Sequence, residues 1–231
     1  MNTSLRPISV LLALIVLGAG TARAAIVPTV SDGPVNNTTL PANLATMATL
    51  TSTGYTSDYG TAGIPILNNQ FVTGQTATDP QLFSQSALSD LIPSYKVTVT
   101  LDTSVQTAGY NIASTETYAF FRTAEPGRSY QNYSLYYSVV GNAAFSLLGQ
   151  FSADGRSTGT VLTLTDTTGL MATGVDALRF DIVQDLVHAG TGYSEFAVYG
   201  TPVPIPEPAS LMLLGALGAL FALRRVRGKT A

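Results

Sequence analysis

Hydrophobic and polar residues alternate in short segments from Tyr95 onward, which is the pattern of half-buried β-strands. In the first segment Tyr95, Val97 and Val99 alternate with Lys96, Thr98 and Thr100. Because successive side chains of a strand point to opposite faces, the apolar set defines a buried face and the polar set an exposed one. The same reasoning predicts further strands in residues 112–121, 133–139, 145–151, 161–165, 178–182 and 196–198.

Turn-forming residues separate these segments, and no long stretch between them has a helical period. The turns are predicted at Ala108-Gly109, Gly141-Asn142 and Asp154-Gly155. Short strands at close spacing with such turns are typical of antiparallel sandwiches and barrels. The sequence therefore predicts an all-β jelly-roll sandwich of about eight strands, with its core in residues 94–200.

Residues 25–93 are rich in Thr, Ser, Asn, Gly and Pro. We expect a loop-rich N-terminal part of the same body, containing loops and short edge strands. Within it, the spacing of Leu82, Phe83, Leu88 and Leu91 in residues 81–91 also fits a single helical turn or a short helix.

Both ends of the chain have the composition of targeting segments. Arg6 precedes an apolar run over residues 8–20, and Ala22-Arg23-Ala24 is a small-x-small cleavage pattern. This combination predicts a helical signal peptide over residues 1–24, read by the Sec export machinery and cleaved after Ala24. A retained membrane anchor is the alternative, but the run is short for a span.

The C-terminal end has three parts. Residues 201–208 form a Pro-rich spacer that contains Pro206-Glu207-Pro208, and residues 209–223 are apolar without a charge. As a helix, the apolar run is about 22 Å long, and its flanking arginines extend its reach in a bilayer. Four basic residues in 224–231 predict a cytoplasmic tail by the positive-inside tendency, which leaves the body beyond the inner membrane.

The body between the two ends is acidic and has no cysteine. Residues 25–202 hold five Lys and Arg residues against 13 Asp and Glu, which gives a formal net charge of −8. This balance argues against nucleic acid as a partner. The absence of cysteine excludes disulfides, and a single histidine disfavours a zinc or copper site. Structural calcium stays open, with loop-like oxygen ligands at Asp32, Asp58, Asp102 and Asp166.

The segment from Phe120 to Tyr133 has the mixture of side chains that a saccharide needs. Aromatic faces cover sugar rings, and planar polar groups bind hydroxyls. The alternative is that the aromatic residues pack in the core and the arginines keep the surface soluble. The candidate ligand-binding residues are Phe121, Arg122, Glu125, Arg128, Tyr130 and Gln131.

Gly155-Arg156-Ser157-Thr158-Gly159 fits a G-x-S-x-G nucleophile motif, and Asp176, Asp181 and His188 follow it. That motif requires a strand–turn–helix elbow, whereas the residues that follow Gly159 predict a strand. His188 lies in a Gly-rich segment, so we interpret it as a solvated loop residue. No pair of carboxylates indicates a glycosidase. We therefore expect no enzyme, with a secreted hydrolase on the same scaffold as the alternative.

The body resembles the galactose-binding-like, or discoidin-like, jelly roll between about Ser94 and Gly200. This resemblance implies the same jelly-roll sandwich. The segments that carry the resemblance are 97–102 (VTVTLD), 109–112 (GYNI), 127–138 (with GR and QNYSLYYS), 174–180 (with GV and ALRF) and 192–200 (GYSEFAVYG).

The C-terminal end resembles the PEP-CTERM sorting signal of Gram-negative bacteria. The matching parts, in order, are Pro206-Glu207-Pro208, the apolar run and Arg224-Arg225. The resemblance implies recognition and cleavage by an exosortase after transient anchoring in the inner membrane. It implies a final place at the cell surface or outside the cell, often among exopolysaccharides. We expect an exported matrix protein that binds polysaccharide, with a purely structural matrix component as a further alternative.

Overall fold

The structure is a computed structural model, which describes residues 25–53, 64–74, 83–84, 94–120, 126–167, 169–183 and 191–205. The predicted signal helix, the predicted transmembrane helix and the Pro206-Glu207-Pro208 motif lie outside these ranges. In the described ranges, no helix is both long and apolar enough to cross a bilayer.

Strands dominate the described residues, and the only helices among them are three short 3₁₀ helices, η1 to η3. The all-β prediction is therefore confirmed. The elements in chain order are β1 (Ile26–Asp32), β2 (Thr38–Thr39), η1 (Leu44–Met47), β3 (Thr49–Thr53), η2 (Ile64–Asn68), β4 (Phe71–Val72), β5 (Phe83–Ser84), β6 (Ser94–Thr100), β7 (Tyr110–Ala119), η3 (Pro126–Ser129), β8 (Gln131–Val139), β9 (Asn142–Ala153), β10 (Thr160–Asp166), β11 (Ala172–Val183) and β12 (Gly192–Pro202).

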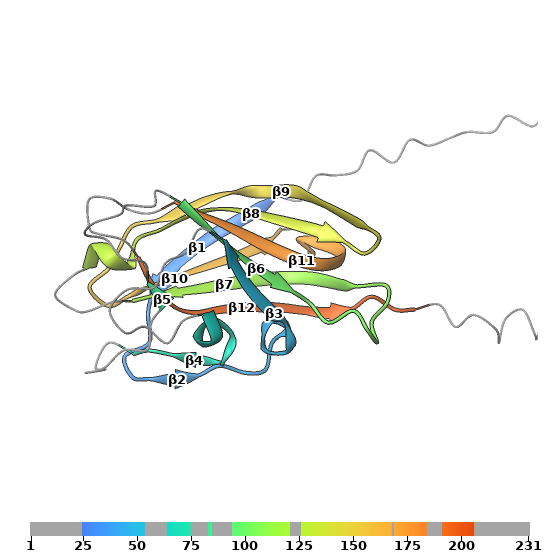
Figure 1. The fold of residues 1–231 in the computed structure, drawn as a ribbon. Coiled ribbons are helices and arrows are strands. Elements are labelled where there is room, and N and C mark those ends of the chain that lie inside the picture. Colours follow the sequence, from blue (N-terminus) through green and yellow to red (C-terminus); the bar gives the residue numbers. More distant parts are fainter. Residues whose placement is uncertain are drawn as a thin grey trace, which may run out of the picture.

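The strands form one ten-stranded antiparallel sheet that folds over on itself as a jelly-roll sandwich, with a separate β2–β4 ribbon beside it (Figure 1). One layer has the order β5-β12-β7-β10-β1, and the other has the order β3-β6-β11-β8-β9. The two layers join where β7 pairs with the start of β11, at Ile112–Ala172 and Tyr110–Val175.

The predicted alternation is visible in the burial of the strands. Along β6, Tyr95, Val97 and Val99 are buried and the residues between them are not. An aromatic chain fills the space between the layers. Phe180 of β11 contacts Phe196 of β12 with ring centroids 4.7 Å apart, and Tyr133 of β8 meets Phe180 edge-on at 5.3 Å. Such tilted and edge-on pairs are the favoured geometry for aromatic rings.

The N-terminal part of the body contributes to both layers. β1 pairs with β10 over its whole length, and β3 pairs with β6. η1 and η2 pack against β12, and η2 also meets β3, so the two helices cover one open side of the sandwich. Within residues 81–91, where a helical turn was an option, Phe83 and Ser84 form β5 instead, and the other residues lie outside the described ranges.

The sandwich has two ends with different contents. β1 begins and β12 finishes at the same end, which we call the terminal end (Figure 1). The Val203 amide donates to the Gly109 carbonyl at 2.9 Å and closes this end. Gly109 has φ +77, and a Cβ there would lie 2.7 Å from the Gly174 carbonyl carbon. The opposite end, the loop end, holds η3 and the β9–β10 turn.

Candidate functional site

The predicted ligand-binding segment lies at the loop end, between β7 and β8. Phe121, Arg122 and Glu125 are outside the described residues. Arg128 in η3 and Tyr130, just before β8, are half-buried and lie at the edge of the sandwich. The prediction that this segment binds a saccharide stays a prediction for these two residues.

Gln131 is fully buried between the two layers. Its side-chain amide donates to the carbonyl oxygens of Thr160, at 2.8 Å, and of Thr117, at 3.1 Å, and its oxygen accepts from the Thr117 hydroxyl. Since Thr117 is on β7 and Thr160 on β10, this one side chain of β8 ties the layers together. The finding corrects the predicted position of Gln131, which does not reach the surface.

Ser129 fixes η3 to the β9–β10 turn. Its hydroxyl donates to the Arg156 carbonyl at 2.8 Å and accepts from the Arg156 amide at 2.7 Å. On the other side, the Thr191 hydroxyl donates to the Tyr130 carbonyl. The backbone that carries Arg128 and Tyr130 is therefore held from two directions, which reduces the entropy lost when a ligand orders it.

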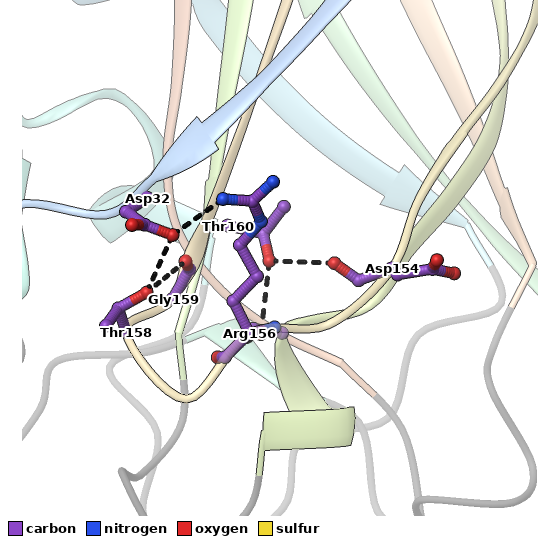
Figure 2. A network of polar contacts seen from close by, with 7 residues as sticks. Asp32, Asp154, Arg156, Thr158, Gly159 and Thr160 are labelled. Atoms are coloured by element: carbon purple, nitrogen blue, oxygen red, sulfur yellow. Dashed lines mark hydrogen bonds and ion pairs between the residues drawn. The ribbon is translucent and has the colours of Figure 1, made fainter.

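The β9–β10 turn is itself bound to β1 (Figure 2). The Asp32 carboxylate accepts from the Arg156 guanidinium at 2.7 Å and from the Thr158 hydroxyl at 3.0 Å. These two hydrogen bonds, with the charge of Arg156, lower the pKa of Asp32. Both partners are exposed, so the pair contributes little to stability and serves mainly to hold the turn.

The G-x-S-x-G motif occupies this same turn. Ser157 is exposed, and residues 160–166 after the motif form β10 rather than a helix. The turn is therefore not a nucleophile elbow. Of the acidic residues that follow the motif, Asp176 accepts from the Ser138 hydroxyl, and Asp181 pairs with Arg179 and Lys96. His188 lies outside the described residues.

A hollow lies between β7, β10 and the segment that follows β1, and it is too narrow to admit water. Arg128 and Tyr130 are not among the residues that line it.

A second group of polar and aromatic side chains lies on the outer face of β11 and its neighbours. The Arg179 guanidinium stacks 4.5 Å from the ring centroids of both Tyr136 and Phe145. Its Nε and one terminal nitrogen donate to the two oxygens of Asp181, at 2.7 and 3.1 Å. This cluster was not predicted from the sequence, although the alternation that buries Leu178 and Phe180 already places Arg179 and Asp181 on the outer face.

Glu195 on β12 lies in surroundings that disfavour an ionised carboxylate. Its side chain is fully buried, and neither oxygen has a hydrogen-bond partner in the described part of the chain. Burial raises the pKa of Glu195 to about 8, although the backbone amides of Gln70 and Asn69 approach the carboxylate closely enough to oppose this rise. Gln70 has a positive φ of 67, so the turn that faces Glu195 is conformationally constrained.

A buried carboxylate without a partner either keeps its proton or binds a cation. No group of three or more His, Cys, Asp or Glu that could hold a metal ion is found in the described ranges. Of the predicted calcium ligands, Asp32 is paired with Arg156 and Asp102 accepts from the Ser104 amide. Asp166 is buried near the terminal end, and Asp58 lies outside the described residues, so the prediction for these positions stays a prediction.

Several solved carbohydrate-binding modules resemble this chain. CpGH89CBM32-5 from Clostridium perfringens, solved with GalNAc-β-1,3-galactose, is 15% identical with a TM-score of 0.46, covering 68% of this chain and 99% of the module. Chitosan-binding module 1 of a Paenibacillus sp. IK-5 chitosanase/glucanase is 13% identical with a TM-score of 0.44. The match covers 69% of this chain and 100% of that module. At these identities and scores the likeness says nothing about ligands.

No curated protein matches the chain significantly. The described β-sandwich ends close to Val203, whose amide makes the last hydrogen bond to the fold. A family model described as the PEP-CTERM protein-sorting motif matches residues 204–227, directly after that point. The match covers the predicted Pro206-Glu207-Pro208, the apolar run and Arg224-Arg225. The chain therefore carries a PEP-CTERM protein-sorting motif behind a jelly-roll body.

Proposed function

We propose that this is an exported, non-enzymatic protein that is anchored transiently in the inner membrane and then placed at the cell surface or in the extracellular matrix. The observation that carries the proposal is the sorting motif at residues 204–227, which begins one residue after the last backbone bond of the sandwich. A folded body followed at once by a sorting segment is the arrangement that a removable anchor requires. The partner would be an exosortase, with Glu207 as a recognition residue rather than a catalyst.

Delivery is tested in the native host by Glu207→Ala. The expected result is that the unprocessed precursor accumulates in the membrane fraction, while Thr201→Ala, which lies before the matched segment, is processed like the wild type. Normal processing of Glu207→Ala would contradict the role of the motif.

We further propose that the body binds polysaccharide on the loop end through Arg128 and Tyr130. Two features support this site: Arg128 and Tyr130 are two residues apart at the loop end, and Ser129 and Thr191 hold the backbone that carries them. The mature protein recovered from cells should bind the host's own extracellular polysaccharide. Arg128→Ala should weaken this binding, whereas Arg179→Ala, on the outer face of β11, should leave it unchanged.

The alternatives give different results in the same experiments. A purely structural matrix component would show no affinity for the polysaccharide in either form. A hydrolase would release product, and Ser157→Ala would abolish that release.

Calcium is proposed as a structural cation at Glu195, with the carboxylate as its ligand. The support is that this carboxylate is fully buried and that both of its oxygens lack a partner in the described part of the chain. When bound, the ion would supply the positive charge that allows the carboxylate to ionise inside the protein.

A further inference from the structure

Exposed apolar side chains gather at the terminal end of the sandwich. Of the nine large hydrophobic residues that are exposed in the described structure, five lie there: Val27, Val105, Val140, Leu170 and Ile205. They come from the start of β1, the β6–β7 loop, the β8–β9 turn, the β10–β11 turn and the segment after β12. Val105 is the most exposed, at 73%.

Strand pairing shows that these separate segments share one end. Val27 pairs with Thr165 near the last residues of β10, and the Val140 amide donates to the Gly174 carbonyl at the start of β11. Tyr110, which follows the β6–β7 loop, pairs with both Val175 and Pro202. None of the described Lys and Arg residues lies at this end. Its exposed acidic residue is Asp102, whose carboxylate accepts from the Ser104 amide.

The chain leaves the sandwich at this same end. Val203 is bound to Gly109, and the apolar segment begins at Ala209, so residues 204–208 are the whole connection. Five residues span at most about 18 Å even when fully extended. A membrane-anchored segment would therefore keep the terminal end within reach of the lipid headgroups.

We infer that the terminal end is a membrane-facing surface, which rests its five exposed apolar side chains on the lipid while the sorting segment is intact. The inference rests on the proposed anchoring of residues 209–223. The attraction is apolar, because the end carries no basic side chain for anionic lipids to bind.

The orientation has a consequence for the loop end. β12 runs from the loop end to the terminal end over eleven residues, which advance about 3.3 Å each and so span about 33 Å. Arg128 and Tyr130 lie at the far end of this length. They therefore point away from the membrane while the protein is still anchored.

The chain has no tryptophan, so a single introduced tryptophan reports on one position. The precursor with its C-terminal segment would be reconstituted into phosphatidylethanolamine–phosphatidylglycerol vesicles that contain brominated phosphatidylcholine, which quenches tryptophan on contact. Val105→Trp tests the terminal end, and Leu170→Trp is a second probe there should Val105→Trp fail to fold. The matched control is Val183→Trp at the loop end of β11, where the wild-type valine is 45% exposed.

The expected result is that the vesicles carry the protein on flotation, that Val105→Trp and Leu170→Trp lose most of their emission, and that Val183→Trp keeps it. Flotation without quenching at the terminal end would overturn this inference and leave the proposed anchor intact. Equal quenching of all three probes would also overturn it, as would a change in emission that follows protein concentration rather than lipid, which indicates a second copy. Failure to float would overturn both the anchor and the inference.

Discussion

Replacing Glu195 with glutamine exchanges a carboxyl group for an amide of nearly the same shape. The side chain lies on β12, fully buried, against the turn at Asn69 and Gln70. The substitution removes the proton equilibrium of this position and keeps an oxygen close to the two backbone amides. The variant therefore isolates the energetic effect of the charge.

The sign of the effect follows from the direction of the pKa change. Burial raises the pKa of Glu195 from its ordinary value of 4.5 to about 8, so the folded protein retains a proton that the unfolded chain releases. The stability that this proton provides is complete below about pH 4.5 and is lost as the pH rises through about 8. At about 1.4 kcal/mol for each pH unit between these values, the full effect is roughly 5 kcal/mol. This is an upper bound, because water entering at the turn would stabilise the carboxylate.

The assay is guanidinium chloride unfolding in the presence of EDTA between about pH 5 and pH 8.5, the range over which the linkage acts. The 11 tyrosines provide the fluorescence signal. The free energy of unfolding of the wild type should fall relative to that of Glu195→Gln by a few kcal/mol as the pH rises. Asp154→Asn, at an exposed position on the β9–β10 turn, should behave like the wild type. Parallel pH profiles for the wild type and Glu195→Gln would show that Glu195 does not retain its proton on folding.

Three further predictions concern cation binding, the interior and the terminal end. Calcium at about pH 8 should raise the unfolding midpoint of the wild type but not that of Glu195→Gln, and an equal response of both proteins would exclude Glu195 as a ligand. Gln131→Leu should lower the free energy of unfolding by about 2 to 4 kcal/mol in denaturant titrations, because it leaves buried carbonyl oxygens without donors. Adding Thr117→Val should recover part of that loss. If the losses of the two single variants simply added in the double variant, the two side chains would not share a network. Gly109→Ala should cost more than about 1 kcal/mol, and more than Gly141→Ala, in the same titrations. Both glycines have a positive φ, but a Cβ at Gly141 meets nothing within 4 Å, so equal losses would show that the contact with Gly174 is unimportant.

The central strands were predictable because their two faces lie in different environments. In β6 and β11, one face meets the core and the other meets solvent, which gives the alternation of Tyr95 to Thr100 and of Leu178 to Ile182. β1 and β3 were expected only as loops or short edge strands. β1 contains Pro28, which is tolerated because β10 is the only strand that pairs with β1 among the described residues. β3 is a threonine-rich edge strand.

Gln131 and Glu195 are both buried polar residues, but the alternation of hydrophobic and polar positions predicts the burial of only one of them. Gln131 lies two and four residues before Tyr133 and Leu135, so it is on the same face of β8, and the alternation alone could have placed it inside. Glu195 alternates with the core residues Phe196 and Val198 of β12, so it belongs to the outer face and would be expected in solvent. It is buried because η1 and η2, from a distant part of the chain, pack over this strand, and no local pattern encodes that contact.

For the candidate saccharide site, the sequence predicted only which segment has a suitable amino-acid composition. The mixture of aromatic and charged residues between Phe120 and Tyr133 identified the segment. Which of its side chains reach the surface depends on hydrogen bonds from the β9–β10 turn and from Thr191, which are far away in the sequence. The cluster around Arg179 was missed for a similar reason, because Phe145 reaches it only through the pairing of β8 with β9.

Mass spectrometry of the mature protein, isolated from host cells with an active sorting enzyme, would identify both ends of the processed chain. The expected protein has an N-terminus at Ala25 and a C-terminus close to Pro206-Glu207-Pro208, with the apolar run and Arg224-Arg225 removed. A mature protein that still ends at Ala231 in such cells would contradict the proposed sorting.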